Sequence, residues 1–291
     1  MSNKPPIEVP QGAIRLNTDS QRLEFFAQDR WYQMATDSPL LAESGDNAVG
    51  ARGIFGTGTT PGTTDFIGFI NIASNGDEQD FGNAVAQAQG ASAGLSSRTR
   101  GIFAGGQQSS PYNEIHFVTI AQKGNSIDFG DLTRGVRFCE GASNQTRGII
   151  AGGMDQPSDG RVNTTEFVTI ATTGNGKDFG DLTVARGQGR GVSNGTLAIF
   201  ACGQTSSTKV NTIDFFTIGT LGNATDFGDS TIETDGQASG GNAIRGIYAG
   251  GSPHGNADQK VIEFITMATK GNATRFGELS VQRSFLAGVS S

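Results

Sequence analysis

The chain has 291 residues, of which 44 are glycine and 8 proline, and 35% are apolar and 17% charged. This composition suits many short strands joined by polar turns, and it excludes a collagen-like chain and a bundle of long amphipathic helices. The formal net charge of −7 argues against a nucleic-acid partner, because phosphate binding needs concentrated Lys and Arg.

The sequence predicts no membrane partner. No stretch approaches the roughly 18 consecutive apolar residues of a spanning helix, and the N-terminus lacks a charged-then-apolar signal pattern. We therefore expect a protein that is made and assembled in the cytoplasm. Cys139 and Cys202 stand at different positions of the repeat described below, so we expect two buried thiols and no disulfide between them.

The N-terminal region, residues 1–41, is predicted to form a small β-meander after a Pro-rich tail. Strand-like runs at 13–16, 22–27 and 31–34 are separated by turn sequences. So small a unit buries too little surface to fold alone, so it must pack on the rest of the chain, on copies of itself or on another protein. Its expected assembly contacts are Ile14, Leu16, Leu23, Phe25, Trp31 and Tyr32.

This region also carries a resemblance. The run Gly-Ala-Ile-Arg-Leu-Asn-Thr-Asp at 12–19, then Leu-Glu-Phe at 23–25 and Trp31, resembles a module that recurs in fibre and appendage proteins of tailed phages. In those proteins the module often lies at subunit contacts, frequently in trimers. The resemblance implies a homo-oligomer, with a trimer favoured, and attachment to other virion proteins through residues 1–41. An ordinary hairpin folded against the rest of the chain is the alternative.

A stretch rich in Ser, Asp, Gly and Ala follows, and we place a linker at residues 42–51. From residue 52 to 291 the sequence repeats five times. Each copy begins with an Arg-Gly-Ile type run, Leu-Ala-Ile in the fourth, and three copies continue into a glycine pair. Such a period is typical of a propeller blade or a solenoid unit. The five runs begin at 52, 100, 147, 197 and 245, with spacings of 48, 47, 50 and 48.

Within each repeat the order of features is constant. The first run is followed by a variable polar loop, an aromatic and β-branched strand, a tight turn, a Phe-Gly strand and a strand ending in Gly-x-Ser. Each Phe of the Phe-Gly pair is expected to pack between neighbouring blades; these are Phe81, Phe129, Phe179, Phe227 and Phe276. The Gly-x-Ser copies are 94–96, 141–143, 191–193 and 288–290, with 240–242 as a weaker one.

The last Gly-x-Ser ends at Ser290, where the next Arg-Gly-Ile strand is due. We therefore expect a strand at about 284–290 to pair with residues 52–56 and close a ring without an open edge. The repeats resemble the kelch repeat, although Phe replaces the usual Trp and two repeats lack the glycine doublet. The resemblance implies an all-β, five-bladed kelch-like β-propeller over 52–291, of a kind found in phage structural proteins. Kelch propellers include enzymes, adaptors and structural proteins, so the fold alone does not fix the function.

The residues that could carry chemistry mostly follow the repeat. The aspartates of the Asp-Phe-Gly triplets, such as Asp128, recur in several repeats and are predicted to be turn acceptors or partners of a blade arginine. Only two histidines exist, and the acidic segment 75–80 lacks the alternation and closing Glu of a calcium loop. We expect no metal, no cofactor and no catalytic residue. An enzyme on the propeller axis would need non-repeating carboxylates there, and the sequence suggests none.

The loops after the glycine pairs vary in length and composition, and variable loops on a rigid scaffold often carry recognition; drift on an unused surface is the alternative. The candidate recognition residues are Tyr112, Asp155, Asp159, Arg161, Lys209 and His254. The leading functional hypothesis is a non-enzymatic virion protein, a tail-fibre or appendage component that contacts the host surface or other virion proteins. A carbohydrate-binding module for a host surface glycan is the second hypothesis, and a propeller enzyme is the third.

Overall fold

The structure is a computed structural model that describes residues 10–17, 22–28, 30–33, 52–59, 63–72, 76–85, 93–107, 110–155, 160–254 and 258–285. These residues form strands and turns without a helix, which confirms the predicted all-β class. Within them there is accordingly no helix that could cross a membrane. The chain divides into two compact units, residues 1–46 and 47–291, and the division falls inside the predicted linker 42–51.

The first unit is a three-stranded antiparallel sheet, as predicted, with strands β1 (Ile14–Asn17), β2 (Arg22–Ala27) and β3 (Arg30–Gln33). The strand register places Ile14 opposite Phe25 and Phe25 opposite Tyr32, whose rings stack at 5.5 Å. Ile14 and Leu16 are 64% and 61% exposed. One face of this sheet is therefore apolar and open to solvent.

The other face of the first unit is packed. Arg15 forms an ion pair with Glu24 at 2.8 Å and lies 4.1 Å from the centre of the Trp31 ring. Trp31 also meets Phe26 edge-on at 5.3 Å. Trp31, one of the six expected contact residues, therefore lies on the packed face. Leu23 pairs with Leu16 in the strand register.

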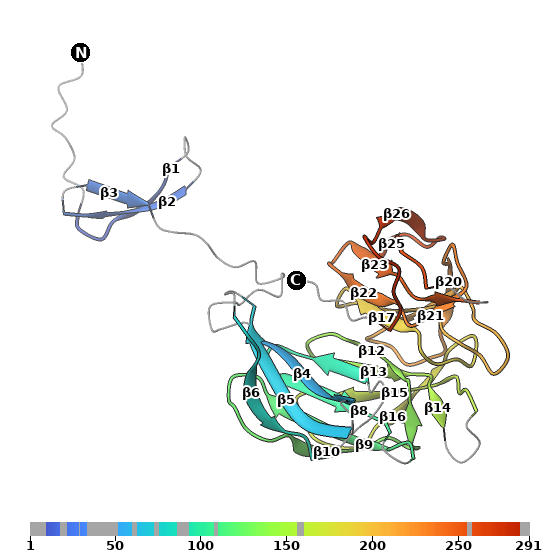
Figure 1. Cartoon of the computed structure of the whole chain (residues 1–291). Coiled ribbons are helices and arrows are strands. Elements are labelled where there is room, and N and C mark those ends of the chain that lie inside the picture. The colour runs from blue at the N-terminus through green and yellow to red at the C-terminus, as the bar shows by residue number, and fades with distance from the viewer. Residues whose placement is uncertain are drawn as a thin grey trace. The chain divides into compact units, whose positions relative to one another are not determined.

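Among the described residues, the second unit contains five larger antiparallel sheets that follow one another along the chain (Figure 1), and two short two-stranded sheets. The first larger sheet has three strands among the described residues and each of the other larger sheets has four. In order within each sheet, the strands are β4 (Arg52–Thr59), β5 (Thr63–Asn71), β6 (Gln79–Asn83); β7 (Ala93–Ser96), β8 (Arg100–Ala104), β9 (Glu114–Thr119), β10 (Ile127–Asp131); β12 (Glu140–Ser143), β13 (Arg147–Ala151), β15 (Thr164–Thr169), β16 (Lys177–Asp181); β17 (Arg190–Ser193), β18 (Leu197–Ala201), β19 (Thr212–Thr217), β20 (Thr225–Asp229); β22 (Ala238–Gly241), β23 (Arg245–Ala249), β25 (Val261–Thr266) and β26 (Thr274–Glu278).

Successive sheets contact one another through β7, β12, β17 and β22, which we call the first strands. Their serines link them: Ser143 Oγ donates to the Ser96 carbonyl at 3.0 Å, and Ser193 Oγ to the Ser143 carbonyl at 2.7 Å. Ser239 Oγ donates to the Gly191 carbonyl at 3.1 Å. The strand register aligns Ser239 with Gly191, so the weak fourth copy is 239–241 and the predicted 240–242 was wrong by one residue.

The phenylalanines of the Phe-Gly strands pack between sheets as predicted in four repeats. Phe81, Phe129, Phe179 and Phe227 are buried, and Phe179 of β16 meets Phe216 of β19 in the next sheet edge-on at 5.3 Å. Phe276 is 56% exposed, so its packing between sheets depends on the predicted ring closure and stays a prediction. It belongs to the last sheet, and no following sheet lies along the described chain to cover it.

Hydrogen bonds between neighbouring sheets repeat with the sequence. The carbonyl of each buried Phe accepts from a glycine N–H of the next repeat, at 2.7 to 2.8 Å; the donors are Gly124, Gly174, Gly222 and Gly271. The following asparagine accepts a backbone N–H of the preceding repeat, as Asn175 does from Asp131 at 3.1 Å. An arginine Nη1 donates forward to an isoleucine carbonyl, as Arg100 does to Ile170 at 2.8 Å.

The predicted closing strand, about 284–290, lies mostly outside the described residues. Ser284 and Phe285, which are described, are not in a strand, and the Phe285 N–H donates to the Gly236 carbonyl at 2.7 Å. In the described residues β4 pairs with β5. Pairing of the chain end with β4 stays a prediction.

Candidate functional site

Three buried carboxylates, which we call the bridging carboxylates, occupy the same position in β15, β19 and β25: Glu166, Asp214 and Glu263. Each accepts hydrogen bonds from the loop of the preceding sheet. Glu263, for example, accepts from Ser230 Oγ at 2.6 Å and from the Thr231 N–H at 2.8 Å. Because they recur with the fold's own period and are satisfied, they hold sheets together.

A fourth buried carboxylate does not follow the repeat. Glu140 is the first residue of β12 and faces Ala151 across the sheet, in the register that Ala93, Arg190 and Ala238 have in their own sheets. Two of these four equivalent positions hold alanine, so the fold does not require a charge there. Glu140 and Arg190 depart from the repeat on neighbouring first strands.

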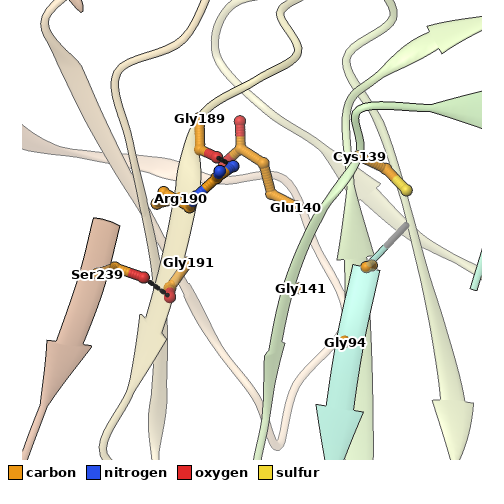
Figure 2. Close-up of a pocket in the computed structure, with 9 residues that line it drawn as sticks. Gly94, Cys139, Glu140, Gly141, Gly189, Arg190, Gly191 and Ser239 are labelled. Atoms are coloured by element: carbon orange, nitrogen blue, oxygen red, sulfur yellow. Dashed lines mark hydrogen bonds between the residues drawn. The ribbon is translucent and has the colours of Figure 1, made fainter. Parts of the chain in front are cut away.

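Glu140 and Arg190 line a cavity of about 280 Å³ between the first strands. Figure 2 shows their side chains reaching toward one another from β12 and β17. The rest of the wall is small or polar and includes Gly94, Gly191 and Ser239. The small residues leave room between the strands for the two charged side chains.

Arg186, from the segment before β17, sits behind Glu140 and is fully buried. Its Nε lies 3.8 Å from Glu140 Oε1, its Nη1 donates to Asp214 at 2.8 Å, and its Nη2 donates to the Phe200 carbonyl at 3.1 Å. Neither carboxylate oxygen of Glu140 has a hydrogen-bond partner among the described residues. Gly189 lies against Glu140 Oε1, where a side chain would overlap the carboxylate.

Burial raises the pKa of Glu140 to about 7, against the opposing charges of Arg186 and Arg190. Asp214 raises this pKa further, and the nearby Gly189 amide lowers it although its N–H falls short of hydrogen-bond geometry. Burial also lowers the pKa of Arg190, and the charges of Glu140 and Asp235 oppose that shift. A buried carboxyl group that titrates near neutrality beside a cavity is a typical mark of a functional site.

The expectation that a propeller axis holds no non-repeating carboxylate stays a prediction, but Glu140 on β12 is a buried carboxylate that the sequence analysis did not single out. The signal was present in the sequence. Aligning the repeats on Gly-x-Ser sets Glu140 and Arg190 against Ala93. Arg186 carried no such signal, because arginine is mostly exposed in proteins and its burial follows from Asp214 and Glu140.

The other titratable groups behave as structural residues. Cys139 and Cys202 are buried and unbridged, as predicted, and burial raises the pKa of each thiol to about 12. His116 is buried against Phe103, with ring centres 5.3 Å apart, and burial lowers its pKa to about 4. Asp128 accepts the Gly130 N–H at 3.1 Å, which confirms a turn acceptor at that copy. Over the described ranges, no three His, Cys, Asp or Glu side chains gather as a metal site would require.

The candidate recognition loops contain more structure than predicted. The loops 154–164 and 252–260 begin with short strands, β14 (Met154–Asp155) and β24 (Ser252–Pro253). These pair with β11 (Val136–Arg137) and β21 (Thr234–Asp235). The loops are therefore partly fixed to the sheets.

Two candidate residues tie successive loops together. Arg161 donates to Gln204 of the next loop at 2.8 Å, and Lys209 binds Asp235 at 3.0 Å and the Ser252 carbonyl at 2.7 Å. Their charges are thus engaged in holding loops in place.

The remaining candidates are scattered. Asp155 forms an ion pair with Arg134 at 3.4 Å, Tyr112 is half-buried, and His254 is exposed. Asp159 lies outside the described residues. A recognition role for these loops stays a prediction.

No protein-family model and no curated protein matches this sequence. The fold and the site define an all-β protein of small repeated antiparallel sheets, with a charged cavity between its first strands.

Proposed function

We propose that this chain is a non-enzymatic structural protein of a phage virion, a tail-fibre or appendage component. It attaches through residues 1–41 and displays the repeated sheets outward. The observation that carries the proposal is the apolar face of the first unit, where Ile14 and Leu16 are exposed beside the stacked Phe25 and Tyr32. A three-stranded sheet with one open apolar face needs a partner to bury it, as the phage-fibre module does at its subunit contacts.

The partner in this proposal is two further copies of the chain, with other virion proteins bound to the resulting trimer. Light scattering of the full chain is expected to give a trimer that Ile14→Asp with Leu16→Asp dissociates. Asp178→Asn, on the exposed edge of β16, is the matched control and keeps the trimer. A monomer at all concentrations refutes the trimer. The virion role is refuted if mass spectrometry does not detect this chain in virions.

For the second unit we propose a five-bladed kelch-like propeller closed by the C-terminal strand. Support comes from the first sheet, β4–β6, and the last sheet, β22–β26. Each leaves exposed the groups that, in the other repeats, contact a neighbouring sheet. Ile72 is 65% exposed, although its equivalents Ile170, Ile218 and Met267 are buried. Phe276 is exposed at the other end of the row of described sheets. In the closed ring the Phe276 ring would pack near Ile70, which the strand register places at the position of Phe216, the residue that Phe179 meets.

Polar groups at the two ends also match. Arg245 stacks on Phe264 at 4.6 Å, as Arg100 does on Phe117 at 4.4 Å before donating to the next sheet. Gly68 stands at the position of the bridging carboxylates, and the Glu78 carboxylate fills the space that a side chain on Gly68 would take. Glu78 thus offers an acceptor for Ser280, the equivalent of Thr231 in the preceding repeat.

Ring closure is testable by deletion. Removing residues 283–291 is expected to lower the melting temperature far more than removing residues 1–41, because it opens the ring. Equal melting temperatures refute closure.

A cross-link distinguishes closure within one chain from exchange between chains. Asp77→Cys with Glu278→Cys is expected to be joined within one chain by a short bismaleimide, as the internal control Asn175→Cys with Asp131→Cys is. Cross-links between chains alone, or none, refute closure within the chain.

A further inference from the structure

We propose that the cavity between the first strands binds a small neutral polyol, of the size of one sugar residue. In this complex the Glu140 carboxylate accepts hydrogen bonds from two ligand hydroxyl groups and the Arg190 guanidinium donates to a ligand oxygen. This site is independent of the structural role proposed above, and it lies apart from the variable loops.

The first support is the unfilled hydrogen-bonding capacity of Glu140. Its side chain is fully buried, and neither oxygen has a hydrogen-bond partner among the described residues. A buried carboxylate without hydrogen bonds is strongly unfavourable, and the bridging carboxylate Glu263 receives two such bonds. Because Ala93 and Ala238 fill the same position in other repeats, the fold has no need of the acid. We assign the missing donors to a ligand in the adjoining cavity.

The second support is Arg190, which departs from the repeat on the adjacent strand. Its Nη1 donates to the Gly189 carbonyl at 2.9 Å, and a guanidinium group has further N–H donors in a fixed planar arrangement. Glu140 and Arg190 thus present acceptors and donors side by side (Figure 2). Adjacent hydroxyl groups, which both donate and accept, match that pair.

The third support is the charge balance and size of the site. The buried network holds two acids, Glu140 and Asp214, and two bases, Arg186 and Arg190, and the neighbouring Asp235 is paired with Lys209. A charged ligand would leave one buried charge unbalanced, which is unfavourable, so the network favours a neutral ligand. The cavity of about 280 Å³ equals about nine liquid-water volumes, enough for one sugar ring and too small for a chain of sugars.

The experiment is a ligand-observed NMR titration of the full chain with glucose, galactose, mannose, N-acetylglucosamine and myo-inositol. Glycine, acetate and ethylammonium serve as zwitterionic, anionic and cationic probes. At least one neutral probe is expected to bind saturably in the millimolar range. Saturable binding of only a charged probe, or of none, overturns the proposal.

Variants place the binding in the cavity. Glu140→Ala restores the alanine of the other repeats, so the chain is expected to fold, and binding should weaken at least tenfold. Arg190→Ala should weaken it as well, while Asp178→Asn, an exposed control, should not. Unchanged affinity in Glu140→Ala, with its melting temperature at least equal to that of the parent, overturns the assignment to this cavity.

Discussion

The bridging carboxylates and Glu140 are all buried glutamates or aspartates, yet they differ in two ways. Glu166, Asp214 and Glu263 recur with the period of the repeat and accept hydrogen bonds from the preceding sheet. Glu140 occurs once and is left without a hydrogen bond among the described residues. A carboxylate that the fold needs is repeated and satisfied, whereas one that is unique and unsatisfied marks a site. Replacing a bridging carboxylate should therefore lower the free energy of unfolding, whereas replacing Glu140 should raise it.

The largest effect is expected at Arg186, which pairs with both Asp214, a bridging carboxylate, and Glu140. Arg186→Ala leaves Asp214 and Glu140 buried without their cation, and removing one partner of a buried pair costs about 3–5 kcal/mol. Urea unfolding is the measurement, with Arg190→Ala as the control, since Arg190 faces the cavity. A loss in Arg186→Ala no larger than in Arg190→Ala would contradict the role of Arg186 as the central cation.

Glu140→Gln is expected to stabilise the protein above pH 7. Because the folded pKa of Glu140, about 7, exceeds the ordinary 4.5, the folded state binds the proton more tightly than the unfolded state. The ionised carboxylate is therefore a penalty that is fully present above pH 7 and is relieved as the pH falls toward 4.5. The gain at pH 8 is on the order of 3 kcal/mol, and it should vanish near pH 4.5.

The matched change Glu263→Gln should have the opposite sign at pH 8. Ser230 Oγ and the Thr231 N–H donate to the two oxygens of Glu263. In the variant, one of these oxygens becomes an amide nitrogen, which cannot accept its hydrogen bond. Unfolding curves of both variants at pH 8 and pH 5 make the comparison. If both variants lost stability at pH 8, the distinction between the two kinds of carboxylate would be wrong.

His116 occupies the position of the bridging carboxylates in β9 and should give the reverse pH dependence. Its folded pKa of about 4 lies below the ordinary 6.5 because it is buried as a neutral ring. The unfolded state therefore takes up a proton first, and stability is lost as the pH falls from 6.5 to 4, by up to about 3 kcal/mol. His116→Gln should flatten this loss, as unfolding followed against pH would show. If the free energy of unfolding of His116→Gln fell with pH as steeply as that of the parent, the loss of stability in acid would belong to other groups.

Features that are local and periodic could be predicted from the sequence. The strands and the buried Phe129 follow from motifs that recur in each repeat. Contacts that a single long side chain makes with residues far away in the sequence could not be predicted. Lys209 spans to Ser252, and Arg186 is buried only because two carboxylates from other strands meet it. The site was missed because recurrence identifies scaffold residues, whereas Glu140 is informative only as an exception to it.

Cys202 is a milder exception to the repeat and should give the smallest effect. It stands where three other repeats have the first glycine of the pair, and its φ of 61° matches the 60° of Gly152. A non-glycine residue in this left-handed region is strained by about 1 kcal/mol. Cys202→Gly relieves that strain but removes a buried thiol from the core, so the free energy of unfolding should change by less than about 1 kcal/mol.

The reverse change, Gly152→Ala, is the matched control and should destabilise strongly, because its Cβ would collide with the Arg186 carbonyl. Chemical denaturation of the two variants measures both effects. A large loss in Cys202→Gly would show that the thiol, which burial keeps protonated with a pKa of about 12, contributes packing that the strain does not offset. Cys202 would then be a departure from the repeat that stabilises the fold, unlike Glu140.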